Sequence, residues 1–499
     1  MTRVSDMNPQ KQGALLDRML SYIHHVLPNL PVSVDGDLCI LFDDDGGGVD
    51  RLSRLPDALH SNIVSRLPVK DAARTAVLSR RWHPVWRSSP LILVDAHLLP
   101  EIPKHVEHAD SNTVVAVVSS ILAVHPGPIR CVHLTCCYMN EFPGEVARWL
   151  QHLAVKGAQE LFLINRPWPL ADITKHMPAT IVSMAALTRL YLCSLNTTRL
   201  PRGAAFPCLC ELGLCCIVIE PRDIEFVLAK SPVLDALYFQ GHLVPSLRLR
   251  LVSQSLRCVQ IHGSNLESVT MVDTPRLERL IVSNSLESNI KIKIGRAPAL
   301  QVFGFFELGK DVLEIGNTVI KAGTPVKPST MVATVKVLAL SVQFGAAWLP
   351  QIVSQPRDAA CSYETSVKTT ESTGRLNLKF WQEAGAIECV QSHINMMAFH
   401  DFRGDRSELA FLKFIIESAQ KLKVLVVEFA NGCVSSETEV KSQVEALFAG
   451  KRGSSSGGCS VLVLENRLSE GTDCWDFERG SEDDPFALFK CKRGCQFSV

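Results

Sequence analysis

The chain lacks an excess of charge of either sign, because 51 lysines and arginines balance 51 aspartates and glutamates. Without a basic surplus, a general electrostatic attachment to nucleic acid or to an anionic membrane is not expected. The sequence also lacks any apolar run near the ~20 residues that span a bilayer. No secretory signal sequence is recognisable, and Cys495 stands one position too early for a prenylation box. The sequence therefore predicts neither nucleic acid nor membrane as a partner.

A regular cysteine framework is missing as well. The 17 cysteines are scattered, and several lie inside apolar segments, such as the pairs Cys136-Cys137 and Cys215-Cys216. Disulfide frameworks are typical of short secreted chains, whereas free cysteine behaves as a small buried hydrophobe. We therefore expect reduced thiols and a location in the nucleus or cytoplasm. The pairs Cys208/Cys210 and Cys491/Cys495 have no second half with zinc-binding spacing, so no metal and no cofactor is predicted.

What is present is a large apolar fraction. Hydrophobic residues make up 46% and charged residues 20% of 499 residues, which is enough for two or more domains or one long repeat array. Residues 1–49 form a leader with one short helix and an Asp/Gly linker. The helix is predicted from apolar residues that recur at helical spacing, namely Leu15, Leu16, Met19, Leu20 and Ile23. The linker run Asp43-Asp44-Asp45 lacks the spacing and the closing glutamate of a calcium loop.

Two Leu-Pro pairs, Leu55-Pro56 and Leu67-Pro68, stand twelve residues apart in the segment 50–95. Each pair opens a short stretch with helical apolar spacing, and proline is favoured at the start of a helix because its missing N–H would be unpaired there. Ser79 is a suitable N-cap for a third helix, although Pro84 predicts a bend or a later start. The segment 50–95 is thus expected to be a module of three short helices.

A six-residue strand pattern, apolar-x-x-apolar-x-apolar, recurs through residues 96–345 every 21 to 29 residues. Its copies begin at Ile129, Ala158, Leu187, Leu209, Leu234, Leu256, Leu277 and Leu300, with an extra copy at Leu266. This period and pattern indicate leucine-rich repeats, which stack into a solenoid with a curved, mostly parallel sheet.

Side chains between the apolar repeat positions point to the other face of the sheet. They predict one column of candidate target-binding residues: His133, Phe162, Tyr191, Tyr238, Gln260, Thr270 and Ile281. The aromatic members favour protein recognition. The alternative is a solvated face without a partner.

The pattern weakens toward the C-terminus. Residues 346–378 are polar and are expected to form an irregular loop. Residues 379–450 predict an α/β segment with a helix at 407–420 and a strand at 422–427, and residues 451–499 predict a Gly/Ser linker and tail with a strand at 461–464. Gly453-Ser454-Ser455-Ser456-Gly457 matches a nucleophile elbow in spacing, but no strand precedes it. No catalytic residue is predicted.

Two of these segments resemble known domains. Residues 50–95 resemble a plant-type F-box through the Leu-Pro-Asp opening, the second Leu-Pro and the close Ser79-Arg80-Arg81-Trp82. The resemblance implies that the pattern positions bind a Skp adaptor: Leu55, Pro56, Leu59, Ile63, Leu67, Pro68, Val77, Leu78 and Trp82. Residues 393–429 resemble the FBD domain of plant F-box proteins with leucine-rich repeats, through His393-Ile394-Asn395-Met396-Met397-Ala398-Phe399-His400, Phe402-Arg403-Gly404 and Ala419-Gln420-Lys421-Leu422-Lys423-Val424-Leu425.

Together the resemblances imply an α/β protein with a three-helix F-box, a leucine-rich-repeat solenoid and a C-terminal FBD extension. The implied function is that of a non-catalytic substrate-recognition subunit, which binds the Skp adaptor of a cullin ubiquitin ligase core and an unknown target protein. Two alternatives are a repeat scaffold that has lost ligase docking and an enzyme with a cysteine or serine nucleophile.

Overall fold

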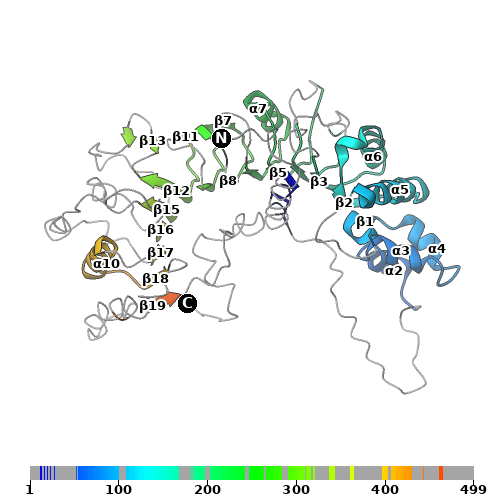
Figure 1. Cartoon of the computed structure of the whole chain (residues 1–499), viewed down its shortest axis with the longest axis horizontal. Helices are drawn as coiled ribbons and strands as arrows, with labels where there is room; N and C mark the ends of the chain where they lie inside the picture. The colour runs from blue at the N-terminus through cyan, green and yellow to red at the C-terminus, as the bar shows by residue number, and fades with distance from the viewer. Residues whose placement is uncertain are drawn as a thin grey trace, which may run out of the picture. The chain divides into compact units, whose positions relative to one another are not determined.

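The computed structural model describes residues 52–99, 108–167, 184–196, 203–241, 247–308 and 406–429 with short gaps. It also describes the helical positions of the leader between 12 and 28, the segments 311–320, 337–342, 360–364, 396–402 and 460–464, and isolated positions. The chain divides into two compact units, residues 1–244 and 245–499, and each is described by itself. Figure 1 labels their elements.

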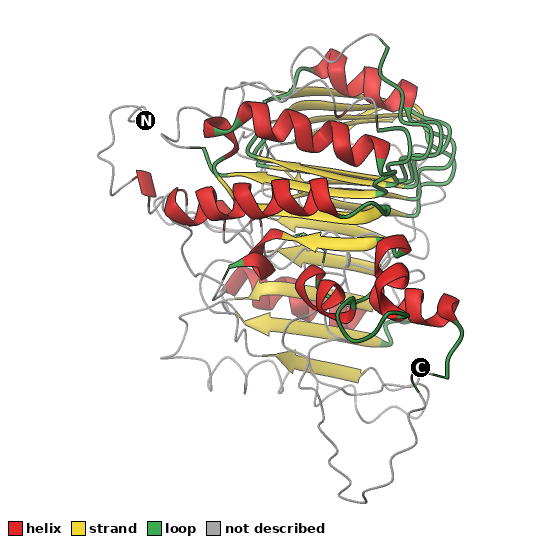
Figure 2. Ribbon diagram, turned by 90° about the vertical axis from the view of Figure 1, so that its right-hand side faces the viewer, coloured by secondary structure: helices red, strands yellow, loops and turns green. Residues whose placement is uncertain are grey.

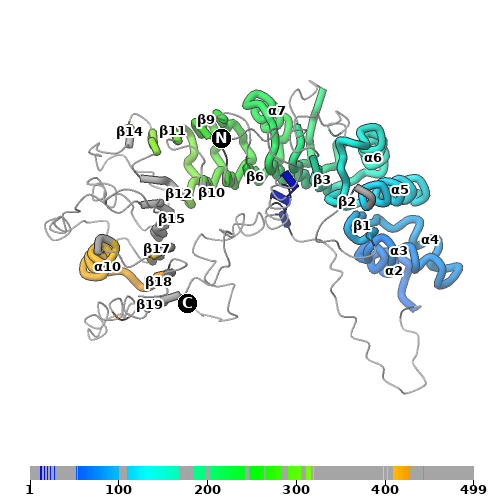
Figure 3. Tube along the Cα trace, viewed as in Figure 1, coloured from blue at the N-terminus to red at the C-terminus, as the bar shows by residue number. Residues whose placement is uncertain are grey.

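Unit 1 begins with three short helices and continues into a parallel sheet. The helices are α2 (Asp57–Val64), α3 (Val69–Thr75) and α4 (Trp82–Ser88), followed by β1 (Leu91–Val94) and the 3-10 turn η2 (Asp95–Leu98). The next strands are β2 (Ile129–Cys137), β3 (Glu160–Asn165), β4 (Arg189–Cys193), β5 (Glu211–Cys215) and β6 (Ala236–Gln240). Each strand pairs in parallel with the next in chain order, and the tube in Figure 3 follows this path.

The helices of unit 1 that connect these strands lie on one face of the sheet. They are α5 (His108–Val124) between β1 and β2, α6 (Pro143–Val155) between β2 and β3, and α7 (Pro221–Lys230) between β5 and β6; a 3-10 turn, η3 (Met139–Glu141), precedes α6. Crossovers between neighbouring parallel strands are almost always right-handed, which puts all three helices on the same side. Figure 2 shows these helices beside the strands. The repeat leucines face them, and residues such as Leu161, Leu163 and Trp149 are at most 2% exposed.

The leader contributes a helix to unit 1, called the leader helix below. Its described helical positions are Gln12, Gly13, Leu16, Met19, Leu20 and Ile23, and the Leu27 N–H donates to the Ile23 carbonyl in the manner of a helix. Leu16, Leu20 and Ile23 are at most 4% exposed, so the apolar stripe of this helix is buried.

Unit 2 contains two sheets. One has the order β8 (Cys258–His262), β10 (Arg279–Ser283), β12 (Val302–Leu308), β15 (Val337–Val342), β16 (Ala360–Glu364), β17 (Met396–Phe402), β18 (Val424–Phe429) and β19 (Ser460–Leu464). The other has the order β14 (Thr318–Ile320), β13 (Val312–Ile315), β11 (Lys291–Arg296), β9 (Leu266–Asp273) and β7 (Leu247–Val252).

Repeat length explains the second sheet. Repeats of 21 to 23 residues, as between Leu256 and Leu300, are too short for a strand, two turns and a helix of ordinary length. A second strand takes the place of the helix, and its apolar residues are buried, as Leu249, Val269 and Ile292 show. The extra copy of the repeat pattern at Leu266 is β9 of this second sheet.

The predicted α/β class with a helical N-terminal module and a repeat solenoid is confirmed. In the C-terminal segment, the predicted helix is α10 (Arg406–Ser418) and the predicted strands are β18 and β19. The expected loop at 346–378 is wrong at one point, because β16 lies inside it and pairs in parallel with β15 and β17. The segment has few large apolar residues, so strand formation there depends on backbone pairing with two neighbours. The remainder of that loop, the Asp/Gly linker and the Gly/Ser segment lie outside the described residues.

Candidate functional site: an apolar face on the N-terminal helices

The three N-terminal helices pack around a small core. Pro56 and Pro68 are the N-caps of α2 and α3, with extended backbones. His60, Val64, Ala72, Trp82 and Val85 are at most 7% exposed, and the His60 and Trp82 ring centroids are 4.4 Å apart. Trp82 therefore organises the module from within. The predicted N-cap at Ser79 is wrong, since α4 begins at Trp82; the Ser79 hydroxyl instead accepts a bond from the Arg81 N–H.

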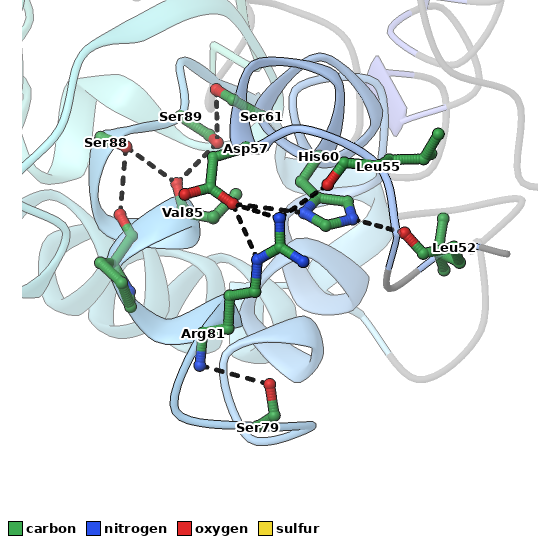
Figure 4. A network of polar contacts seen from close by, with 11 residues as sticks. Leu52, Leu55, Asp57, His60, Ser61, Ser79, Arg81, Val85, Ser88 and Ser89 are labelled. Atoms are coloured by element: carbon green, nitrogen blue, oxygen red, sulfur yellow. Dashed lines mark hydrogen bonds and ion pairs between the residues drawn. The ribbon is translucent and has the colours of Figure 1, made fainter. Parts of the chain in front are cut away.

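A polar network ties the start of α2 to the start of α4 (Figure 4). The Arg81 guanidinium donates to Asp57 Oδ1 from Nε at 2.9 Å and to the Leu55 carbonyl at 2.6 Å. His60 Nε2 lies 2.7 Å from the Leu52 carbonyl. These bonds fix the Leu-Pro segment onto α4, and the Asp57–Arg81 pair was not identified from the sequence because its members are 24 residues apart.

The same module exposes several large apolar side chains. Leu52, Leu59, Val77 and Leu78 are 46%, 49%, 84% and 66% exposed. They are four of the nine large hydrophobic residues exposed among the described residues, and they fall within 27 consecutive positions. A cluster of this kind is unfavourable for an isolated chain and marks an interaction surface. We call Leu52, Leu59, Val77 and Leu78 the apolar face.

The nine predicted adaptor-binding positions divide by exposure. Leu59, Val77 and Leu78 belong to the apolar face, and Pro56 is also exposed. Leu55, Ile63, Leu67 and Pro68 are half-buried at its margin. Trp82 is buried at 7% exposure, so it does not offer its ring to a partner. Leu52, which the sequence pattern did not single out, adds to the surface.

The helical module is fastened to the first repeat strands. Pro68 forms a parallel bridge with Ile92 of β1, and Lys70 Nζ donates to the Leu98 carbonyl at 2.9 Å. Ser89 contacts Ser61 of α2 through their hydroxyls at 2.9 Å. Since β1 is also the first strand of the sheet, the apolar face and the repeats of unit 1 share one continuous framework.

Asp95 anchors this junction. It is fully buried, and its Oδ2 accepts the backbone N–H groups of Thr135 and Cys136 at 2.7 Å each, while the Thr135 hydroxyl donates to Oδ1 at 3.1 Å. Burial raises the pKa of Asp95 to about 6, and the hydrogen bonds and the charge of Arg166 partly oppose this rise. A lone aspartate after a strand carried no pattern from which this role could be inferred.

In unit 1, the predicted target-binding column is a stack of rings. His133, Phe162, Tyr191 and Tyr238 lie in register on β2, β3, β4 and β6, with Gly213 of β5 between the two tyrosines. Their centroids are 3.9, 4.7 and 6.3 Å apart in order. A side chain at Gly213 would meet the Tyr191 ring, so the glycine leaves room for the ring to lie flat. We call these four residues the ring column.

A charged triad borders the ring column toward the start of the strands. Arg189 Nε donates to Glu211 at 2.7 Å, and an Arg189 terminal nitrogen lies 3.4 Å from Glu160. The Tyr191 hydroxyl donates to Glu211 at 3.0 Å. Burial, followed by the charge of Glu211, raises the pKa of Tyr191 well above its ordinary value. The triad residues stand two positions before Phe162, Tyr191 and Gly213 on the same strands, so they lie on the face of the ring column. They are 21 to 30% exposed.

The column differs from the prediction in two respects. His133, Phe162, Tyr191 and Tyr238 are at most 2% exposed, so something covers them. In unit 2, Gln260 and Ile281 pair in register on β8 and β10 and are also buried. The prediction for Thr270 is wrong, because this residue lies on β9 in the second sheet, between Arg250 and Lys293. The error arose because the extra copy of the repeat pattern was taken for a strand of the main sheet.

Burial works against nucleophilic reactivity at several of the described thiols. Burial raises the pKa of Cys136, Cys137 and Cys216 to about 12 and that of Cys131 further still. Reactive cysteines have lowered pKa values instead. Cys208 and Cys210 are exposed, and desolvation raises the pKa of Cys210. Among the described residues, no group of three or more His, Cys, Asp or Glu side chains is arranged to hold a metal ion. No described helix has the length and apolarity needed to cross a membrane.

A three-helix module with an apolar face, joined to a leucine-rich-repeat solenoid, defines a class of modular binding proteins. Comparison with known families specifies it. Residues 52–93 match the F-box domain, residues 146–355 match the repeats of the family described as "FBD-associated F-box protein At5g56370, LRR repeats", and residues 382–427 match the FBD domain. The chain therefore carries matches to an F-box domain, to the leucine-rich repeats of F-box proteins and to an FBD domain, in that order.

Relatives in Arabidopsis thaliana carry names with the same domains. F-box/FBD/LRR-repeat protein At1g13570 is 27% identical over 49% of this chain and 56% of its own length, and F-box/LRR-repeat protein 13 is 26% identical over 47% and 52%. Putative FBD-associated F-box protein At3g50710 is 22% identical over 83% of this chain and 100% of its own length. The chain spans about half the length of the first two.

Proposed function

We propose that the protein is the substrate-recognition subunit of a Skp–cullin–F-box ubiquitin ligase, working in the nucleus or cytoplasm. The observation that carries the proposal is the apolar face. Four large apolar side chains project from a helical module whose own core is already filled by Val64, Trp82 and Val85. A helical partner with an apolar groove would bury them, which is the usual mode of helix-in-groove docking.

The junction supports this role mechanically. A receptor accelerates ubiquitin transfer by holding its target near the partner enzyme, which is an effect of proximity and orientation. The orientation of the bound target is kept only if the helical module does not move relative to the repeats. The buried Asp95 bonds and the Pro68–Ile92 bridge stiffen that connection.

The protein would contribute binding and no chemistry of its own. The raised pKa values of the buried thiols support a non-catalytic role, because a cysteine nucleophile needs its thiolate. Nine described cysteines form no disulfide and seven of them are buried, which fits a reducing compartment. The F-box and repeat matches are to modules that bind proteins.

The test is capture of a purified Skp adaptor by the full chain and by the variant Val77→Glu/Leu78→Glu. Burying a Val and a Leu side chain together contributes about 3 kcal/mol, or about a hundredfold in Kd. We expect a loss of at least that size, since the variant also buries charge. Val155→Glu is the matched control, because Val155 is 89% exposed on α6, away from the apolar face. Equal capture by all three chains would show that docking occurs elsewhere or not at all.

The second candidate, a repeat scaffold without ligase docking, predicts a different result. In that case the wild-type chain itself does not capture the adaptor, although it remains folded. A cullin-containing complex reconstituted around the wild-type chain distinguishes the two functions directly, because only a docked receptor brings the cullin with it.

A further inference from the structure

The ring column is buried on the face opposite the three described crossover helices of unit 1. Helices α5, α6 and α7 connect parallel strands and lie on the opposite side. Stacking covers the faces of the rings, yet their outer edges point away from the sheet and are still at most 2% exposed. A segment other than these three helices therefore covers them.

The leader helix is in contact with this part of the sheet. Met19 Sδ lies 4.0 Å from the Ser194 hydroxyl, directly after β4, across 175 positions of sequence. Ser194 is fully buried and has a positive φ of 55°. Its N–H donates to the Cys215 carbonyl, and its own carbonyl accepts a bond from Asn165. The loop that receives Met19 is therefore held rigidly by β3 and β5.

The leader helix is amphipathic, and its apolar side is buried. Leu16, Leu20 and Ile23 are spaced at i, i+4 and i+7 and are at most 4% exposed, which is one stripe of a helix. An isolated helix of this length is marginal in water, so packing of the stripe against the rest of unit 1 stabilises it. Figure 1 draws its described positions in dark blue.

From these contacts we propose that the leader helix occupies the target-binding face as an intramolecular competitor. The target is a protein segment that forms an amphipathic helix with the same i, i+4, i+7 apolar spacing, and it binds the ring column by displacing the leader. This inference rests on the proposed receptor function and adds the class of target and its regulation. The triad Glu160–Arg189–Glu211 has a net charge of −1, so it favours a basic side chain on the incoming segment.

The experiment uses a fluorescein-labelled synthetic peptide of residues 8–30 and the full chain. Wild-type protein is compared with Leu16→Glu/Leu20→Glu/Ile23→Glu, which disrupts the buried stripe, and with Met19→Glu, a milder change at a partly exposed position. Val155→Glu is the control for added charge. Binding is measured by fluorescence anisotropy, with a second peptide that carries the same three glutamate substitutions as the negative probe.

We expect the triple variant to bind the peptide at least tenfold more tightly than wild type, with Met19→Glu in between and Val155→Glu equal to wild type. Equal affinity for the wild type and both leader variants would overturn the proposal. If a melting curve shows the triple variant unfolded, Met19→Glu decides the matter alone. Adaptor capture is measured on the same samples. If the adaptor is not captured but the peptide affinities differ as expected, the ligase role is refuted and the competitor role stands. If the adaptor is captured but the peptide affinities are equal, only the competitor role is refuted.

Discussion

Replacement of Asp95 by asparagine tests whether the junction between the helical module and the repeats depends on a buried carboxyl group. The side chain is fully buried, and its pKa rises from 3.8 to about 6. A carboxyl with a raised pKa in the folded state binds its proton more tightly when folded. Its contribution to stability is therefore fully present below pH 3.8 and is lost as the pH rises through 6.

The size of this contribution follows from the two pKa values. At about 1.4 kcal/mol for each unit, ionised Asp95 lowers the stability of the junction by about 3 kcal/mol once the pH exceeds 6, and about 1 kcal/mol of this falls between pH 5 and pH 7. Asparagine keeps one oxygen for the Thr135 and Cys136 N–H groups and does not ionise. We expect Asp95→Asn to gain about 1 kcal/mol relative to wild type between pH 5 and pH 7.

The assay is native-state hydrogen exchange of the peptide that contains Thr135 and Cys136, because it reports the opening of this junction rather than of the whole array. Wild type and Asp95→Asn are compared at the same pH, so that the intrinsic pH dependence of exchange cancels. Asp71→Asn, at a partly exposed carboxylate paired with Arg74, is the control. A difference between wild type and Asp95→Asn that stays constant from pH 5 to pH 7 would refute the reasoning.

Three further predictions concern packing and thiol reactivity. Trp82→Ala should destabilise the helical module by about 3–5 kcal/mol and remove adaptor binding together with a lost melting transition, unlike a change on the apolar face. Gly213→Ala should lower the melting temperature of unit 1, since its Cβ meets the Tyr191 ring at a cost of about 1–3 kcal/mol; Gly144→Ala, which meets nothing within 4 Å, should not. Among the nine cysteines whose burial is described, a thiol reagent should label the exposed Cys208 and Cys210 before the other seven. Mass spectrometry that found the buried seven labelled at the same rate would contradict the assigned burial.

The sequence predicted the order of the parts well, because each has a local pattern. Two Leu-Pro pairs specify the starts of α2 and α3 through the fixed backbone of proline, and the recurrence of leucines specifies parallel strands. The helix α10 was predicted from its apolar face alone. The structure places its boundaries at 406 and 418, within two residues of the prediction.

Exposure could not be predicted in the same way. Along α2, the pattern positions are Leu59 and Ile63, and the structure shows that the buried residues are instead His60 and Val64. Apolar residues on both sides of a short helix give no periodic contrast, so the sequence does not tell which side faces the core. That difference decides which residues can dock, as the burial of Trp82 shows.

Repeat length carries information that the strand pattern does not. Where successive copies are 29 residues apart, as between Ile129 and Ala158, the crossover holds the 13-residue helix α6. Between Leu234 and Leu300, where successive copies are 21 to 23 apart, the crossovers hold the strands β7, β9 and β11 of the second sheet. Thr270 was misplaced because copies were aligned by pattern alone. A column of recognition residues in such a protein should therefore be traced only through copies that are a full repeat apart, because each repeat contributes one strand to the main sheet. The copy at Leu266 begins midway between those at Leu256 and Leu277, so this criterion would have excluded Thr270.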